Sequence, residues 1–224
     1  MWFPNQPPRV DWSKAERALS RDPVMRAIIR RVGPCALAPR RDYFVKLCQS
    51  IFTQQISTKV AAVLFARFRD QFPSRRPTPQ RVLEIIDDAE TMRRCGLSRQ
   101  KQAYVKDLAA HFASSEIPTR RLAGMSDDEV IETLVRVKGI GRWTGEMFLI
   151  FTLNRPDVLP VDDLGLRKGA QTIFGLKQTP DAKKLTKLAE PWRPYRSIGT
   201  WYAWRGTVTP IVKKPVAASP AIAK

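Results

Sequence analysis

The stretch Leu134-Val-Arg-Val-Lys-Gly-Ile-Gly-Arg-Trp-Thr144 decides the fold of this chain. One helix is expected to end near Arg136 and a second to begin near Gly141, because the glycines at 139 and 141 allow a tight reversal with positive φ. Such a turn points backbone N–H groups and the positive end of the second helix at one place, which is an arrangement that binds phosphate. A plain helical hairpin, in which the glycines only close the turn, is the alternative interpretation.

The composition favours a polyanionic partner. The 224 residues include 39 Lys and Arg against 21 Asp and Glu, a net charge of +18 that is spread along the chain and not gathered in one run. Nucleic acid is the first interpretation, and an acidic membrane surface or a ribosome-like assembly are the alternatives. No run approaches about 18 apolar residues, so no transmembrane helix is expected.

Residues that ligate metals are scarce. The three cysteines, at 35, 48 and 95, form no C-x-x-C pair, and His111 is the one histidine of the sequence. This pattern excludes a cysteine-ligated zinc or iron–sulfur site, a histidine metal cluster and most Ser/His triads. We expect reduced thiols, and we expect His111 to be a surface or packing residue of a helix.

Helical periodicity covers almost the whole chain. Apolar side chains recur every three to four residues over 42–54, 57–72 and 98–114. Thr78-Pro79 and a capping box that begins at Ser126 mark two further helix starts. Because no segment alternates with a period of two, the sequence predicts an all-α fold of roughly ten short helices with no sheet domain. The Pro-rich residues 1–10 are expected to be extended, and 206–224 to form a loose tail.

The hairpin stretch resembles the helix-hairpin-helix of base-excision DNA glycosylases, and specifically the 3-methyladenine DNA glycosylase II (AlkA-type) branch. Four more stretches resemble the same branch in the same order, over about residues 40–205: Gln54-Gln-Ile-Ser57, Cys95-Gly-Leu-Ser-x-x-Lys-x-x-Tyr104, Leu159-Pro-Val-Asp-Asp163, and Arg196-Ser197 leading to Trp204. The resemblance implies two all-α lobes with a DNA-binding cleft between them. One lobe would comprise 1–37 plus 156–205 and the other 38–155, and the family's extra mixed α/β domain is expected to be missing.

Two adjacent carboxylates, Asp162 and Asp163, follow Pro160 where a new helix is expected to start. One of them should cap the helix, since Asp is a preferred N-cap residue. Cleavage of an N-glycosidic bond builds positive charge on the sugar, and a fixed carboxylate stabilises that charge and orients water. The resemblance implies that Asp163, 20 residues after Trp143, is the catalytic aspartate. Asp162 is the alternative, and is otherwise expected to be the cap or a neighbour of the DNA backbone.

Trp143 distinguishes two mechanisms within the resemblance. Bifunctional relatives such as endonuclease III carry at this position a lysine that forms a Schiff base with the sugar and nicks the strand. They also carry a four-cysteine iron–sulfur motif, which is absent from this sequence. The resemblance therefore implies a monofunctional enzyme that leaves an abasic site.

A group of apolar side chains is expected to form a pocket for the extruded base. Trp143, Met147 and Ile150 fall on one face of the predicted helix, a pattern that core packing would also produce. The resemblance places Trp143 and Trp204 in the base pocket, and at Met147 the AlkA-type pattern has Tyr. Indole faces would hold a cationic alkylated purine by stacking and cation–π attraction.

The expected DNA contacts lie at two connections between helices. The polar stretch at 54–57 ends one helix and caps the next with Ser57. The resemblance implies that Gln55 fills the gap left by the extruded nucleotide, where AlkA has Leu. The hairpin residues expected to hold the DNA backbone are Lys138, Gly139, Ile140, Gly141, Arg142 and Thr144.

The sequence thus predicts a monofunctional glycosylase that removes alkylated purines from duplex DNA as a monomer, in the cytoplasm at the nucleoid, or in the nucleus if the source is eukaryotic. The alternatives are a non-catalytic helix-hairpin-helix DNA-binding module and a bifunctional glycosylase–lyase. No cofactor is expected to be required. The backbone carbonyls of Val137 and Ile140 are candidates for a monovalent cation that bridges to a DNA phosphate.

Overall fold

The computed structural model describes residues 10–208, and every regular element among them is helical. The helices are α1 (Ser13–Leu19), α2 (Pro23–Val32), α3 (Tyr43–Thr53), α4 (Thr58–Arg69), α5 (Pro79–Ile85), α6 (Ala89–Arg94), α7 (Arg99–Ala113), α8 (Asp127–Leu134), α9 (Arg142–Phe148), α10 (Leu164–Ile173), α11 (Ala182–Ala189) and α12 (Arg196–Val208). Three 3-10 turns, η1 (Pro73–Arg75), η2 (Leu122–Gly124) and η4 (Glu190–Trp192), and one π-helical turn, η3 (Leu149–Leu153), accompany them. The predicted all-α fold is confirmed.

The predicted helix starts are confirmed, and each is formed by a side chain close to it in the sequence. Ser57, Thr78 and Ser98 each accept a hydrogen bond from a backbone N–H in the first turn of the helix that follows. Ser126 and Glu129 form the reciprocal capping box at the start of α8. These caps fix where each helix begins.

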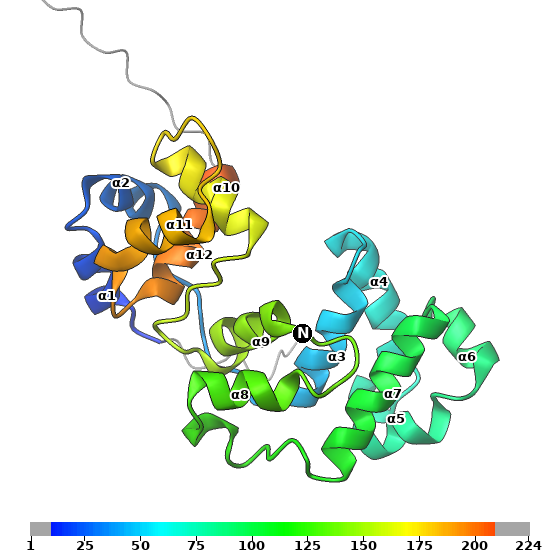
Figure 1. Ribbon diagram of the computed structural model, residues 1–224. Coiled ribbons are helices and arrows are strands. Elements are labelled where there is room, and N and C mark those ends of the chain that lie inside the picture. Colours follow the sequence, from blue (N-terminus) through cyan, green and yellow to red (C-terminus); the bar gives the residue numbers. More distant parts are fainter. Residues whose placement is uncertain (1–9, 209–224) are drawn as a thin grey trace, which may run out of the picture.

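Figure 1 shows two groups of helices. Helices α1, α2, α10, α11 and α12 lie together, and α12 packs against α10, α2 and α1 although these are distant in sequence. Helices α3 to α7 form the second group, in which α7 packs against α3 and α5. Helix α9 packs against α3 and α8 and lies where the two groups meet.

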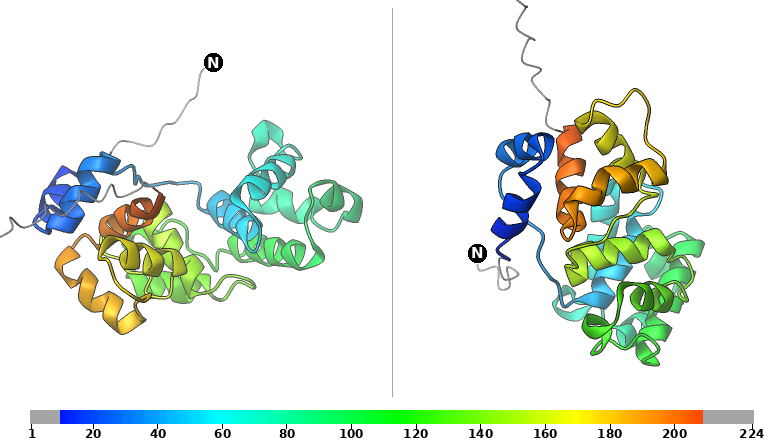
Figure 2. Two further views of the ribbon diagram at one scale, coloured as in Figure 1. Left: turned by 90° about the horizontal axis from the view of Figure 1, so that it is seen from above. Right: turned by 60° about the vertical axis from the view of Figure 1, so that its left-hand side comes forward.

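Two extended connections join the groups. The segment between α2 and α3 crosses from one group to the other (Figure 2), and the return runs from η3 to α10. The predicted lobe boundaries near 37 and 156 fall within these two connections. At the C-terminal end, α12 continues through Val208, three residues into the range predicted as tail, and residues 209–224 and 1–9 lie outside the described part of the chain. Among residues 10–208, no helix combines the length and apolarity needed to cross a bilayer.

Candidate active site

The Asp163 side chain is the centre of the site. It is the N-cap of α10, and its Oδ1 accepts a hydrogen bond from the Leu166 N–H at 2.5 Å. The same Oδ1 accepts the Trp204 indole N–H at 2.8 Å, and Oδ2 accepts the Trp143 indole N–H, also at 2.8 Å. The expectation that Asp162 is the cap is wrong, because one carboxylate has enough lone pairs to cap the helix and to hold both indoles. Asp162 is exposed.

The two tryptophans reach the same carboxylate from two different helices. Trp143 belongs to α9, and Trp204 belongs to α12. Trp143 is 47% exposed, whereas Asp163 is only 9% exposed. The structure therefore presents a fixed and mostly buried carboxylate beside an accessible aromatic face.

The aromatic wall continues with a residue that the sequence analysis missed. Phe151 is 43% exposed and stacks on Trp204, with ring centroids 5.5 Å apart and an interplanar angle of 17°. Phe151 and Met147 also line a cavity of about 210 Å³ that faces polar side chains of α3.

Ile150, which shares a predicted helix face with Trp143 and Met147, is fully buried in the core, as the core-packing interpretation of that face predicts. The π-helical turn η3 places more residues in one turn than an α-helix does and so changes which side chain returns to the Trp143 face. The spacing of Trp143, Met147 and Phe151, four residues apart at each step, is the signal that was available in the sequence.

The hairpin between α8 and α9 depends on one of its two glycines. Gly139 has φ +80°, and a Cβ atom there would lie 2.2 Å from the ring of Tyr104. Gly141 has φ −100°, caps α9 and has open space where a Cβ would be. The expectation of positive φ at both glycines is therefore wrong for Gly141, because the reversal is completed at Gly139 and extended backbone enters the next helix.

The side chains of the hairpin divide into exposed cations and buried packing residues. Lys138 is 75% exposed and Arg142 is 64% exposed, and Arg142 also pairs with Glu146 at 3.3 Å. Thr144 and Ile140 are buried, at 6% and 4% exposed. Their side chains belong to the core, so only their backbone groups are available at the hairpin.

Glu146 is a buried carboxylate next to the candidate active site. Burial raises the pKa of Glu146, and the nearby charges of Asp162 and Asp163 raise it further, while Arg142 opposes the shift. The Glu146 side chain therefore favours the neutral form more than an exposed glutamate does.

The loop between α3 and α4 lies beside the hairpin. Gln55 is exposed and has φ 59°, in the left-handed region. The preceding side chain, Gln54, donates from Nε2 to the Gly139 carbonyl at 2.8 Å. Gln54 therefore joins this loop, residues 54–57 and here called the wedge loop because Gln55 is predicted to fill the gap in the duplex, to the hairpin glycine.

The described residues hold no group of three or more His, Cys, Asp or Glu side chains placed to bind a metal ion. His111 packs on α7, with Nδ1 2.9 Å from the Asp107 carbonyl oxygen. At the hairpin, the Val137 carbonyl accepts the Ile140 N–H at 3.1 Å. A carbonyl oxygen has two lone pairs, and this bond uses one of those of Val137.

Comparison with known proteins agrees with this geometry. Residues 48–194 match the family described as HhH-GPD superfamily base excision DNA repair protein. The chain belongs to this superfamily. The resemblance inferred from the five sequence stretches is confirmed.

Two relatives and one solved structure are similar to this protein over most of the chain. DNA-3-methyladenine glycosylase 1 of Schizosaccharomyces pombe is 36% identical over 214 residues, covering 91% of each chain. Alkylbase DNA glycosidase-like protein mag2 of the same organism is 34% identical over 205 residues, covering 87% of this chain and 93% of the relative. The solved structure of the S. pombe 3-methyladenine DNA glycosylase Mag1 in complex with abasic DNA has a TM-score of 0.77 at 35% identity, and the match covers 86% of this chain and 95% of that one.

Proposed function

We propose that this HhH-GPD protein is a monofunctional DNA glycosylase that hydrolyses the N-glycosidic bond of alkylated purines, of the 3-methyladenine and 7-methylguanine type, in duplex DNA. The observation that carries the proposal is the buried Asp163 carboxylate held between the indole N–H groups of Trp143 and Trp204. The names of the relatives, which describe glycosylases of 3-methyladenine and alkylated bases, support the same reaction.

Asp163 acts on the sugar of the extruded nucleotide. As the bond to the base breaks, positive charge develops on the sugar ring, and the fixed carboxylate stabilises that charge and orients the attacking water. The two indole bonds and the α10 cap prevent the carboxylate from rotating away. The preorganised charge is therefore in place before the bond breaks.

The product is an abasic site and not a nicked strand. A lyase needs an amine that attacks the sugar carbon to form a Schiff base. The position that carries this lysine in bifunctional relatives is Trp143, whose N–H is bonded to Asp163. The Trp143 side chain has no amine to form a Schiff base, so the reaction stops after hydrolysis.

The base is held by aromatic rings. Trp204 with its stacked partner Phe151, and the exposed Trp143, provide faces for a flipped base. A purine alkylated at N3 or N7 carries positive charge, which adds cation–π attraction and makes it a good leaving group. The wall therefore selects cationic lesions, and Met147 contributes an apolar and non-aromatic surface.

The protein engages DNA as a monomer through its hairpin and wedge loop. The side chains of Lys138 and Arg142 and the backbone N–H groups of Gly139 and Gly141 hold a phosphate, and Gln55 fills the gap left in the duplex. A monovalent cation on the Val137 and Ile140 carbonyls would supply charge against the same phosphate. No cofactor takes part in the hydrolysis, and the enzyme acts where cellular DNA is, in the cytoplasm or nucleus.

One assay tests the proposal against its alternatives. Methylated duplex DNA is incubated with the protein, and released base and strand breaks are measured with and without alkali. Base release with breaks that need alkali is the expected result. Breaks without alkali would identify a lyase, and the absence of both would identify a DNA-binding module without catalysis.

A further inference from the structure

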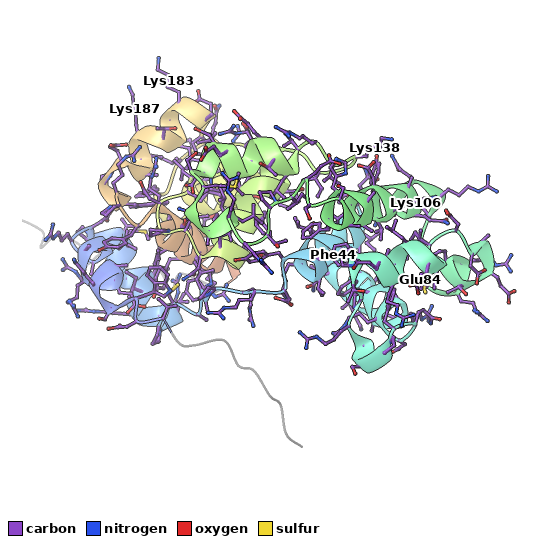
Figure 3. The ribbon with its side chains drawn as sticks, turned by 90° about the horizontal axis from the view of Figure 1, so that it is seen from below. Phe44, Glu84, Lys106, Lys138, Lys183 and Lys187 are labelled. Atoms are coloured by element: carbon purple, nitrogen blue, oxygen red, sulfur yellow. The ribbon has the colours of Figure 1, made fainter. Side chains whose placement is uncertain are left out.

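Helix α7 touches both of the loops that face DNA, through three side chains on one face. Lys101, Tyr104 and Asp107 are three residues apart at each step, a spacing that turns each side chain about 60° from the one before it and keeps all three within about a third of the helix circumference. Lys101 reaches the loop between α3 and α4, and Tyr104 lies under Gly139. Asp107 accepts the backbone N–H of Lys138 at 2.8 Å, and Figure 3 shows Lys138 beside this helix.

Lys101 holds the end of α3 through two hydrogen bonds. Its Nζ donates to the carbonyl oxygens of Phe52 and Gln54, both at 2.8 Å. These carbonyls lie at the C-terminal end of α3, where the helix dipole places negative partial charge. The second carbonyl belongs to the residue directly before Gln55, so the ammonium fixes the chain where it enters the left-handed conformation of Gln55.

The bond from Gln54 to the Gly139 carbonyl completes the connection. The loop, the hairpin and α7 thus hold one another in one arrangement, around a cavity of about 390 Å³ that Lys101, Gln55 and Trp143 help to line. Burial of the Lys101 ammonium lowers its pKa, so the charge is kept there at a cost. The two hydrogen bonds that Nζ donates offset this cost.

We propose that Lys101 is a positioning residue that sets the place of Gln55 relative to the hairpin, and that this placement governs extrusion of the nucleotide from the duplex. The inference rests on the proposed glycosylase function. Lys101 acts through the backbone of the wedge loop and does not touch the reacting atoms. Replacing Lys101 should therefore slow excision from substrates in which the nucleotide must be unstacked, and should leave the chemical step at Asp163 unchanged.

The test compares duplex and single-stranded substrates that carry the same methylated purine. A single strand has no partner strand to separate and no gap for Gln55 to fill. For Lys101→Met, the single-turnover excision rate from duplex should fall about 10- to 100-fold, as for a displaced positioning group, while the rate from the single strand changes less than about 3-fold. Lys106→Met is the matched control, because Lys106 lies on the same helix (Figure 3), is half exposed and pairs with the exposed Asp87.

Chemical rescue shows whether the Lys101 ammonium group itself supports the excision rate on duplex DNA. Lys101→Cys should behave like Lys101→Met, and alkylation of the new thiol with 2-bromoethylamine rebuilds a lysine-like side chain and should restore most of the duplex rate. The three native cysteines are buried, and burial raises the pKa of Cys35 to about 11, so they react slowly. Gln54→Leu removes the hydrogen bond to the hairpin and should lower the excision rate from duplex DNA in the same way. This variant takes the place of Lys101→Met if that protein does not fold.

Equal losses on both substrates, an unchanged duplex rate, or no recovery after alkylation would overturn the proposal. Failure of the glycosylase function is a different result, since the wild-type protein would then release no base from either substrate.

Discussion

Replacing Asp163 with asparagine separates the charge of this side chain from its hydrogen bonds. The asparagine oxygen can take the place of Oδ1 and keep the bonds from Leu166 and Trp204. Its amide nitrogen then faces the Trp143 N–H, so a donor meets a donor where Oδ2 accepted a bond. The fold is kept, one charge-assisted bond is lost, and the negative charge beside the sugar disappears.

The magnitudes follow from these contacts. Loss of one hydrogen bond to a charged group costs about 1.5–3 kcal/mol, which for a chain of this size lowers Tm by about 3–12 °C. Because Trp143 is 47% exposed and its N–H can turn to water, we expect the lower half of that range. Loss of one preorganised electrostatic group should reduce the excision rate by about 10²- to 10³-fold.

The assay is single-turnover release of 7-methylguanine from duplex DNA, with Tm and DNA affinity measured on the same preparations. Asp162→Asn is the matched control, since Asp162 is the exposed neighbour of Asp163. It should keep both stability and rate. Excision that survives in Asp163→Asn but is lost in Asp162→Asn would refute the assignment of the catalytic carboxylate.

Three further outcomes test other parts of the site. Gly139→Ala should lower the free energy of unfolding by at least about 1–2 kcal/mol, because φ at this position is positive, and should weaken the salt-sensitive binding to undamaged duplex. Gly141→Ala should leave Tm nearly unchanged, and equal effects of the two substitutions would contradict this account of the hairpin. Phe151→Ala and Trp204→Ala should each slow excision of 3-methyladenine. The wild type should remove neutral hypoxanthine more slowly than 3-methyladenine, and equal rates for the two bases would argue against cation–π selection. Glu146→Gln should melt at or above the wild-type temperature at pH 7, because burial raises the pKa of Glu146 and the charged form is disfavoured in the fold. As the pH falls through that raised pKa, the stability of the wild type should increase relative to that of the variant. A variant that is less stable than the wild type at pH 7 would show that the ion pair with Arg142 outweighs the cost of burying the charge.

Local chemistry explains which parts of the fold could be predicted from the sequence. Helix starts such as those at Ser57, Thr78 and Ser126 depend on one side chain and the backbone two or three residues away. The tight turn at Gly139 follows from the positive φ that glycine allows. These features are readable because no distant contact is needed to form them.

The parts that could not be predicted depend on packing between distant segments. Asp163 combines capping with two indole bonds because α9 and α12 meet at the start of α10, and no spacing in the sequence reports that meeting. Phe151 reaches the pocket through a π-helical turn, which breaks the regular period on which the prediction rested. The contacts of Lys101 join residues that are 47 and 49 positions apart, so the motif around it showed a resemblance but not a role.

The two indole bonds to Asp163 also give the protein an optical signal of its own. The emission of tryptophan depends on the polarity and hydrogen bonding around the ring, and two of the six tryptophans donate to this one carboxylate. A nucleotide that enters the site must stack on these rings or change their bonds. Their fluorescence therefore reports occupancy directly, and the arrival and departure of DNA can be followed in time with neither protein nor substrate labelled.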